Sequence, residues 1–304
     1  MPQMANAFLT PGLLGRRAMS SPPVVQLFYN PASGSFAPAR IERLARAFAA
    51  LGARVLKSPS VSEPPVIAHE ATHACIAGGD GTVRHVAMAI ARSGRKLPAA
   101  IWPAGTVNLL AREGPDCASP ERLAADLLGE SDRREHWPVR LGETMFLACA
   151  SVGPDARAVA GVSGALKRRI GRLAYAVSFL SLLRRWPRSS LTVKADGRTL
   201  ACEAVFVAKG RHYAGPWSFA PRASVSDGVL HVIALHRARR RYFARFLVDL
   251  ALGRYPARRS GVTALVTRSL SIDGSEPLPV QADGDVVASL PVRLAVAERP
   301  LHFR

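Results

Sequence analysis

The chain has 304 residues, 48% of them hydrophobic, and carries a net charge of +19 with a sequence pI near 11.2. This length suffices for one large or two ordinary domains with a real core. The excess of Lys and Arg implies an anionic partner, either nucleic acid or acidic lipid headgroups, unless it only reflects an Arg-rich proteome. No uncharged apolar run approaches the roughly 18 to 20 residues of a membrane-spanning helix.

The first 23 residues lack the basic start and long apolar core of a secretory signal. Residues 1–23 are expected to be a disordered tail or an overlong start, with Met19 as the alternative first residue. The four cysteines lie far apart and show no metal-ligand spacing, which indicates thiols in a reducing, cytoplasmic compartment.

Alternating strand and helix patterns begin at residue 24. Val24–Tyr29 is predicted to be a strand that runs into a turn rich in Asn, Pro, Ser and Gly, Asn30–Gly34. Residues 40–51 place apolar side chains at helical spacing and are followed by a glycine. A short strand at 53–57 and a Ser/Pro-rich loop at 58–65 follow.

His69-Glu-Ala-Thr-His73 matches H-E-x-x-H, the zinc-protease signature in which two His one helical turn apart bind the metal. The signature needs a helix on both sides. Here Pro64-Pro65 lies just upstream, and an apolar strand begins directly downstream. We therefore interpret the match as a coincidence.

That strand ends at a glycine turn, Ala74-Cys-Ile-Ala-Gly-Gly-Asp-Gly-Thr82, where a helical pattern begins. Gly78, Gly79 and Gly81 let main-chain N–H groups approach a ligand, and the start of a helix favours an anion. The carboxylate of Asp80 would repel a phosphate unless it holds a cation, orients a sugar or takes a proton. The turn indicates a phosphate site, with an ordinary strand-to-helix turn as the alternative.

Two better-known phosphate loops are excluded. No Gly-Lys pair occurs in the chain, which rules out the Walker-type loop, and Arg84 stands where a glycine would complete G-x-G-x-x-G. A second strand instead runs through a Pro/Gly turn into a helix at Ile101–Arg112. Two such loops in successive βα units would lie side by side at the carboxyl edge of one parallel sheet.

A helix is predicted at Pro120–Leu128, and the pattern changes at a charged run near Arg133. Beyond it, strand-like runs with polar alternation predict antiparallel sheets packed face to face. These runs are Thr144–Val152, Ser190–Lys194, Cys202–Ala208, Val229–Leu235, Ser269–Ile272, Val280–Ala282 and Val292–Val296.

Two segments, 165–186 and 236–252, interrupt these strands with basic and apolar residues at helical spacing. Such a pattern suits a helix that lies among lipid headgroups, and it equally suits a core helix with a solvated basic face. No basic-aromatic signature of RNA binding is present, so nucleic acid is not the expected partner.

Several motifs together resemble the catalytic domain of the diacylglycerol kinase family, which includes sphingosine and ceramide kinases and bacterial lipid kinases. In the first half they are Asn30-Pro31…Ser33-Gly34, Gly78-Gly-Asp-Gly-Thr82 and Pro103-Ala-Gly-Thr-Val-Asn108. In the second half they are Ser151-Val-Gly-Pro-Asp-Ala156, Leu166-Lys-Arg-Arg-Ile-Gly-Arg-Leu-Ala-Tyr175, Ala220-Pro-Arg-Ala-Ser-Val-Ser-Asp-Gly228 and Ala282-Asp-Gly-Asp285. Their shared order over nearly the whole chain from residue 24 is far more specific than any one motif.

This resemblance implies an α/β N-terminal domain with a parallel sheet, of the NAD-kinase/diacylglycerol-kinase type, and a mainly antiparallel β-sandwich C-terminal domain. The expected boundaries are 24–133 for nucleotide binding and 134–291 for the lipid substrate, with the last strand, about 292–304, returning to the first domain. The implied activity is transfer of the γ-phosphate of ATP to the hydroxyl of a diacylglycerol- or sphingoid-like lipid at an anionic membrane surface. A homodimer is compatible with this assignment.

The resemblance also implies which residues form the site. Asp285 is the expected base, and Asp80 acts through Mg²⁺ or the phosphates. The nucleotide-binding residues carried over are Asn30, Gly34, Gly78, Gly79, Asp80, Gly81, Thr82, Gly105, Thr106 and Asn108. Ser224, Asp227 and Val229 match a structural Mg²⁺ site, the first and last through backbone oxygens, and an ordinary hairpin turn at Asp227-Gly228 is the alternative.

The chain departs from the family pattern in three places. Arg84-His85 replaces the usual Asn-Glu, Lys209 stands where an Asn often precedes the second-domain glycines, and Asp285 replaces a Glu. The last departure bears on the assigned base and raises a nucleotide-binding pseudokinase as an alternative. An NAD kinase is the other alternative, because those enzymes share the Gly-Gly-Asp-Gly-Thr turn.

Overall fold

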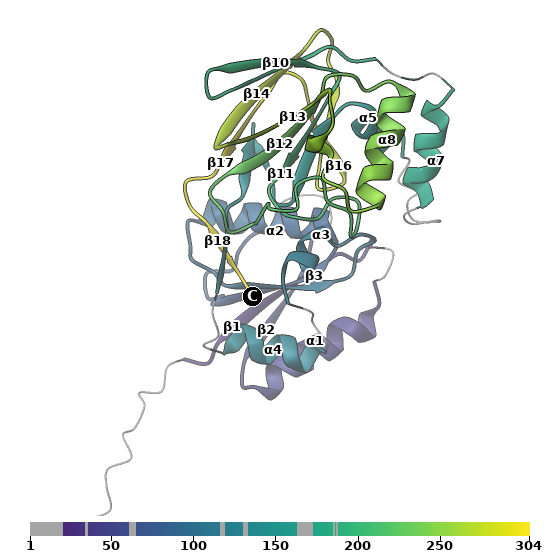
Figure 1. Ribbon diagram of the computed structural model, residues 1–304. Helices are drawn as coiled ribbons and strands as arrows, with labels where there is room; N and C mark the ends of the chain where they lie inside the picture. The colour runs from purple at the N-terminus through teal and green to yellow at the C-terminus, as the bar shows by residue number, and fades with distance from the viewer. Residues whose placement is uncertain are drawn as a thin grey trace, which may run out of the picture.

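The computed structural model describes residues 21–33, 36–60, 65–115, 119–129, 133–162, 173–184, 186 and 188–304. Figure 1 shows an α/β layer below and a β-rich layer above it. The expectations for residues 1–20, for Gly34 and for most of the motif at 166–175 lie outside the described residues. Within the described ranges, no helix is long and apolar enough to cross a membrane.

The lower layer contains a six-stranded sheet with the order β2-β1-β3-β4-β18-β5. β1 (Val24–Tyr29), β2 (Arg54–Pro59), β3 (His73–Gly78) and β4 (Ala99–Pro103) are parallel. β1 and β3 are almost wholly buried, which explains why they read as continuous apolar runs. Because β1, β3 and β4 are adjacent and parallel, the three predicted loops leave the sheet at the same edge.

Helices cover both faces of this sheet (Figure 1). On one face, α1 (Pro38–Ala50) and α4 (Pro120–Leu128) bury Leu44, Phe48 and Leu127 against the strands. On the other face, α2 (Asp80–Ser93) and the short α3 (Leu109–Glu113) pack between the sheet and the upper layer. Only this second face can share a site with the C-terminal domain.

The upper layer is a sandwich of two six-stranded antiparallel sheets, as predicted. One sheet consists of β10 (Arg198–Cys202), β9 (Leu191–Ala195), β14 (Ser269–Gly274), β17 (Val292–Val296), β6 (Val139–Leu141) and β7 (Thr144–Phe146). The other consists of β13 (Val262–Thr267), β12 (Leu230–Leu235), β11 (Ala204–Ala208), β8 (Cys149–Val152), β15 (Pro279–Ala282) and β16 (Asp285–Ser289). Apolar side chains from both sheets form one core between them.

The predicted strand Thr144–Val152 is wrong as a single element. The structure splits it into β7 and β8, which belong to different sheets. The break falls at Leu147 and Ala148, whose N–H groups donate to the buried carboxylate of Asp283 at 2.8 Å each. A side chain from the other end of the chain thus interrupts the strand.

In the described part of the chain, three helices and a 3₁₀ turn flank the sandwich: α5 (Pro154–Ala160), α7 (Leu173–Leu182), α8 (Arg240–Ala251) and Pro256–Arg258. The segment predicted as helix 236–252 becomes helical only at Arg240, because Ala238 is held outside the helix by Glu203 and Trp186. α8 buries Phe243 and Phe246, so one of its faces is a core face.

The last strand of the chain connects the sandwich back to the first sheet. β18 (Leu301–Phe303) returns from the sandwich to the first sheet, where it pairs with β4 and with β5 (Arg134–His136) (Figure 1). The expected boundaries differ in two details. β5 lies beyond residue 133 yet belongs to the first sheet, and within 292–304 only β18 does, since β17 stays in the sandwich.

Candidate active site

Two glycine loops meet at the carboxyl edge of the parallel sheet. The backbones at Gly79 and Gly105 are so close that a Cβ built on Gly105 would lie 2.4 Å from the Cα of Gly79. The N–H of Ala104 also donates to the carbonyl oxygen of Gly78 at 3.0 Å. Only residues without a side chain allow this approach, so the predicted pairing of the loops explains both glycines.

The loop that follows β1 contacts the glycine turn after β3 through Asn30. Its amide nitrogen lies 3.5 Å from the hydroxyl oxygen of Thr82, and its amide oxygen accepts the N–H of Ala32 at 2.8 Å. The structure thus brings the first and second predicted motifs together at the start of α2. Gly34, the last residue of the first motif, lies outside the described residues.

Asn108 closes the second loop. It adopts a left-handed backbone conformation with φ of 55°, and its side chain accepts the N–H of Gly105 at 2.8 Å and donates to the carbonyl of Gly105 at 2.9 Å. This amide shapes the loop from within, whereas Thr106 is exposed at the tip of the same loop. Asn108 thus shapes the loop, and its direct contact with nucleotide stays a prediction.

Asp80, the first residue of α2, also contacts the second loop. One of its carboxylate oxygens accepts the N–H of Leu110 at 3.2 Å, at the beginning of α3. Burial, together with the nearby Asp283 carboxylate, raises the pKa of Asp80 to about 7, against the opposing effect of the N–H groups at the start of α3. Asp80 is therefore half-buried and anchored, and not in an exposed turn.

The hairpin between β15 and β16 brings Asp285 to the same place. Asp283 and Gly284 have φ angles of 49° and 86°, so they form the primed type of two-residue turn that joins antiparallel strands. Asp285 follows as the first residue of β16. Its carboxylate is so close to Gly81 that a Cβ built on that glycine would lie 2.8 Å from it. The motif is thus a hairpin turn that also borders the glycine turn at Gly81.

Arg84 fixes this contact. Its guanidinium, only 7% exposed, donates to the carbonyl oxygen of Ala282 at 2.9 Å and to the Asp285 carboxylate at 3.2 Å. The Asp285 side chain is 37% exposed, so it remains accessible to a substrate. Two of the three departures from the family pattern, Arg84 and Asp285, are therefore partners across the domain junction.

Asp283 has a different role from its neighbour two residues along the chain. It is buried, and its carboxylate accepts the N–H groups of Leu147, Ala148 and Cys149. Burial raises the pKa of Asp283, while Arg84 and these N–H donors oppose the shift. Asp283 thus holds the hairpin against β8 and leaves Asp285 as the accessible carboxylate of the turn.

The third departure, Lys209, lies in the region of the expected metal site. Lys209 follows β11 and is completely buried, and its ammonium donates to the carbonyl oxygens of Ser224, at 2.9 Å, and of Asp227. Burial lowers the pKa of Lys209 to about 8, and the Asp227 and Glu113 carboxylates oppose this shift, so the side chain is still mainly protonated at pH 7. The turn formed by Ser224 and Asp227 precedes β12 and is not a tight hairpin.

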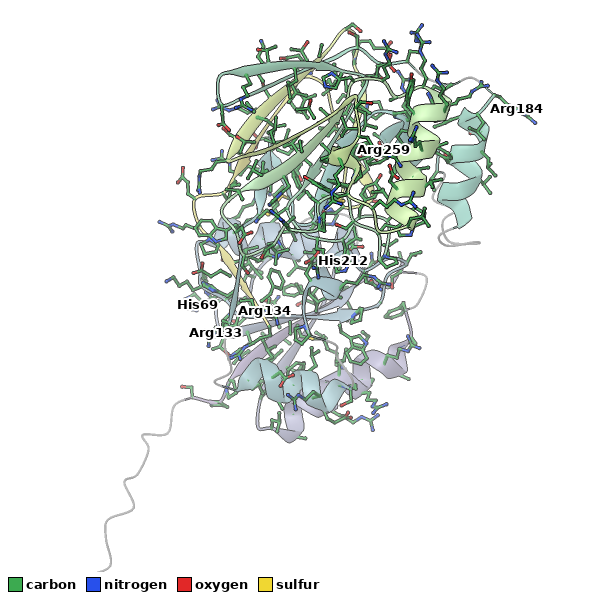
Figure 2. The ribbon with its side chains drawn as sticks, viewed as in Figure 1. His69, Arg133, Arg134, Arg184, His212 and Arg259 are labelled. Atoms are coloured by element: carbon green, nitrogen blue, oxygen red, sulfur yellow. The ribbon has the colours of Figure 1, made fainter. Side chains whose placement is uncertain are left out.

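The H-E-x-x-H match is not a metal site. His73 is the first residue of β3, and His69 lies in the turn before it, on the outer side of the first domain (Figure 2). The two imidazoles therefore do not share a helix face. In the part of the chain that the structure describes, no three His, Cys, Asp or Glu side chains cluster as metal ligands would.

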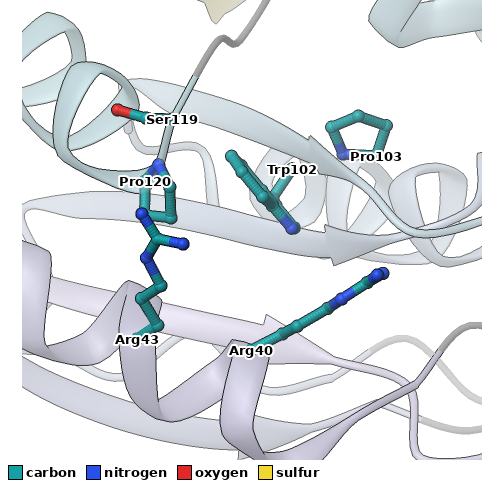
Figure 3. Close-up of a pocket in the computed structure, with 6 residues that line it drawn as sticks. All are labelled: Arg40, Arg43, Trp102, Pro103, Ser119 and Pro120. Carbon is teal, nitrogen blue, oxygen red and sulfur yellow. The ribbon is translucent and has the colours of Figure 1, made fainter.

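A cavity of about 310 Å³ lies beside the second loop, on the face of the sheet that α1 and α4 cover (Figure 3). Its lining consists of Arg40, Arg43, Trp102, Pro103, Ser119 and Pro120. None of these residues was predicted as a site residue, although Trp102 and Pro103 lead directly into the loop. The cavity therefore adds a guanidinium-lined recess next to the glycine loops, on the side away from Asp285.

The sequence reasoning missed what Arg84, Asp283 and Lys209 do. Arg84 and Lys209 had been noted only as departures, and Asp283 only as part of a turn. A charged residue in an otherwise apolar stretch, such as Lys209 directly after Ala204–Ala208, was the available signal. It indicates a buried charge, but it does not name the partner.

Comparison with known proteins agrees with this geometry. Residues 24–134 match the diacylglycerol kinase catalytic domain, and residues 148–303 match the YegS C-terminal NAD kinase beta sandwich-like domain. A "Probable lipid kinase YegS-like" of Pseudomonas aeruginosa PAO1 is 31% identical over 242 residues, which cover 74% of each chain. The diacylglycerol kinase of Bacillus subtilis is 24% identical over 231 residues, or 74% of this chain and 75% of that one.

A solved structure shows the same fold. The diacylglycerol kinase from Bacillus anthracis superposes with a TM-score of 0.70 over 93% of this chain and 97% of that chain, at 19% identity. The predicted fold class and the predicted family are both confirmed. The chain belongs to the diacylglycerol kinase family of lipid kinases, with a C-terminal domain of the YegS type.

Proposed function

We propose that this protein transfers the γ-phosphate of ATP to the hydroxyl of a diacylglycerol- or sphingoid-like lipid. One observation carries the proposal. The accessible carboxylate of Asp285 lies against Gly81 inside the glycine turn, although the two residues belong to different domains. A carboxylate beside a phosphate loop is what phosphoryl transfer to an alcohol needs.

The phosphates would lie at the start of α2. Main-chain N–H groups from Gly79 to Thr82 and the helix dipole favour negative charge there. Gly78, Gly105, Thr106 and Asn30 border the same place, and Asn108 supports it by shaping the second loop. Because such a loop contributes no covalent chemistry, positioning and charge neutralisation carry most of the rate enhancement.

Asp285 would act as the general base. It accepts the proton of the lipid hydroxyl while the hydroxyl oxygen bonds to the γ-phosphorus and the bond from that phosphorus to the bridging oxygen breaks, which releases ADP. Arg84 would orient Asp285, because its guanidinium is held by the carbonyl of Ala282 as well as by the carboxylate. The Asp side chain is one methylene shorter than the Glu expected here, and the contact with Gly81 shows that it still reaches the turn.

Asp80 would hold the Mg²⁺ that accompanies ATP. A hard cation takes oxygen ligands, and Asp80 offers a carboxylate directly at the phosphate loop. When bound, the ion neutralises charge that develops on the phosphates. Asp80 would also orient the second loop through the N–H of Leu110.

The lipid would be reached from a membrane surface. α7 and α8 lie side by side in Figure 1, and both expose large apolar side chains, namely Val177, Leu180 and Val248, with Leu252 exposed directly after α8. Each nearby Lys or Arg contributes on the order of 1 kcal/mol at an anionic surface and is screened over roughly 8 to 10 Å. Sedimentation with anionic vesicles should therefore exceed that with neutral ones and weaken as salt rises. Equal sedimentation with both kinds of vesicle would contradict this role.

The test of the activity is radiolabelled ATP with a panel of acceptors: diacylglycerol, sphingosine, ceramide, undecaprenol and NAD. We expect label in a lipid and none in NAD. Asp80→Asn should remove most turnover and keep the fold, since the Asn oxygen still accepts the N–H of Leu110. Label in NAD alone would favour an NAD kinase, and nucleotide binding without turnover would favour a pseudokinase.

A further inference from the structure

The turn at residues 224–229 is bound by a buried side-chain cation, the ammonium of Lys209. Lys209 is fully buried, and its ammonium donates to the carbonyl oxygens of Ser224 and Asp227. The resemblance had assigned this turn, with Ser224, Asp227 and Val229, to a structural Mg²⁺. We propose that the Lys209 ammonium replaces that ion, so that the turn is fixed without a metal.

The oxygens of this turn do not fit Mg²⁺. The ion demands an octahedron of oxygen ligands at about 2.0 to 2.1 Å. The carbonyl of Ser224 already accepts the Lys209 ammonium at 2.9 Å and the N–H of Asp227 at 3.2 Å. A Mg²⁺ on the same oxygen would stand within about 5 Å of the ammonium, where two positive charges repel each other.

A second cation strengthens the mismatch. A Cβ built on Gly228 would lie 2.7 Å from a guanidinium nitrogen of Arg268, so this positive group borders the turn as well. Asp227 is exposed and is the only carboxylate among the three expected ligands. One carboxylate beside two side-chain cations gives these groups a net positive charge, which repels a divalent ion, and Lys209 supplies the excess.

The lysine-held turn braces the domain junction. The N–H groups of Lys209 and Gly210 both donate to the carbonyl of Ala148. The turn bonds to the segment that enters the sandwich, since Val225 accepts the N–H of Trp137 at 3.0 Å and Ser226 donates to the carbonyl of Glu135 at 2.7 Å. Loss of the cation should therefore loosen the link between β5 and β11.

His212 extends this brace to the first domain. Its ring and its N–H both contact the Glu113 carboxylate at the end of α3, at 3.0 and 2.8 Å, and Figure 2 shows it between the two layers. Lys209 is thus placed where a structural metal would act, because one internal charge ties together strand, turn and junction.

The first test uses the unaltered protein without nucleotide. After treatment with EDTA and gel filtration, we expect no stoichiometric Mg²⁺ by elemental analysis. We also expect the Tm in EDTA and in millimolar MgCl₂ to agree within about 1 °C. One retained Mg²⁺ per chain, or a clear fall of Tm in EDTA, would overturn the proposal whatever the variants do.

The second test recreates a metal site. Lys209→Asn removes the ammonium and frees the carbonyl oxygens, so its Tm in EDTA should fall, and Mg²⁺ at about 100 times its Kd should raise the Tm by about 5 to 10 °C. Lys209→Met and the double variant Lys209→Asn/Asp227→Ala should lack this gain. Two outcomes would contradict the proposal that Lys209 replaces the ion. In the first, the Lys209→Asn variant keeps the original Tm in EDTA. In the second, the variant has a lower Tm in EDTA and Mg²⁺ does not raise it. Neither test involves turnover, so both are independent of the proposed activity.

Discussion

Arg84 and Lys209 are two buried cations that differ in what they hold. Both donate to main-chain carbonyls, Arg84 to Ala282 and Lys209 to Ser224 and Asp227. Arg84 also bonds to a carboxylate that remains 37% exposed beside the glycine turn, whereas the hydrogen-bond partners of Lys209 among the described residues are two carbonyls of a turn. We therefore propose that the first cation orients a reactive group and that the second replaces a structural ion. The role of a buried charged side chain can therefore be inferred only when its bonding partner is known.

Asp285→Asn should have the largest effect, because it removes the proton acceptor and keeps the size of the side chain. We expect kcat to fall roughly 100-fold or more, with the Tm and the affinity for ATP near their original values. Asp285→Glu should retain substantial activity. The control is Asp273→Asn on β14, where the carboxylate is 47% exposed and lies 4.0 Å from Lys194. Full activity of Asp285→Asn would assign the proton to Asp80 or to solvent.

Lys209→Met should act mainly on stability. Two carbonyl oxygens of the turn lose the ammonium as a donor, and each such loss costs roughly 1 kcal/mol or more. We expect the free energy of unfolding to fall by about 2 kcal/mol, measured by urea denaturation in EDTA, with a much smaller loss of kcat than in Asp285→Asn. Lys194→Met, which changes a side chain that is 61% exposed, is the matched control. A large loss of kcat with little loss of stability would instead indicate that Lys209, like Arg84, positions groups at the site.

Arg84→Gln tests whether Arg84 acts through Asp285. We expect kcat to fall about 10-fold, because the carboxylate loses the group that orients it. The double variant Arg84→Gln/Asp285→Asn should then be no slower than Asp285→Asn alone, since residues that act as a unit are not additive. Additive losses would show that Arg84 acts on the phosphates directly.

His136 offers a smaller test at the same junction. It is buried on β5, 2.9 Å from the carbonyl of Leu147, and burial lowers its pKa to about 3, with Lys209 contributing in the same direction. Above pH 6.5 it is neutral in both folded and unfolded states. As the pH falls from 6.5 toward 3, only the unfolded state takes up the proton, so stability is lost by up to about 1.4 kcal/mol per pH unit.

His136→Gln should remove this contribution to the acid sensitivity. Urea denaturation between pH 6.5 and 4.5 should show a shallower loss of stability in His136→Gln than in the unaltered chain. His69→Gln, which changes an exposed histidine, should follow the unaltered chain. Identical slopes in all three proteins would show that His136 accepts a proton without disturbing the junction.

Local chemistry determined the first domain. Apolar strands that end in glycine turns can be recognised from the sequence alone. The main chains at Gly79 and Gly105 are so close that neither position can carry a side chain, so glycine is required at both. The same holds for the hairpin, where Asp283 and Gly284 suit the positive φ angles of the turn. The order of these motifs was enough to identify the family and the sandwich.

Tertiary structure alone decided what the charged residues do. Asp283 and Asp285 are two residues apart and have the same side chain, yet one is buried on three N–H groups of the β7–β8 break and the other faces Gly81. Arg84 and Lys209 could be recognised as departures, but their partners lie in distant segments that only the packing of the two domains brings close. A charge acquires its role from the atoms that desolvate and bond it, and no local pattern specifies those atoms.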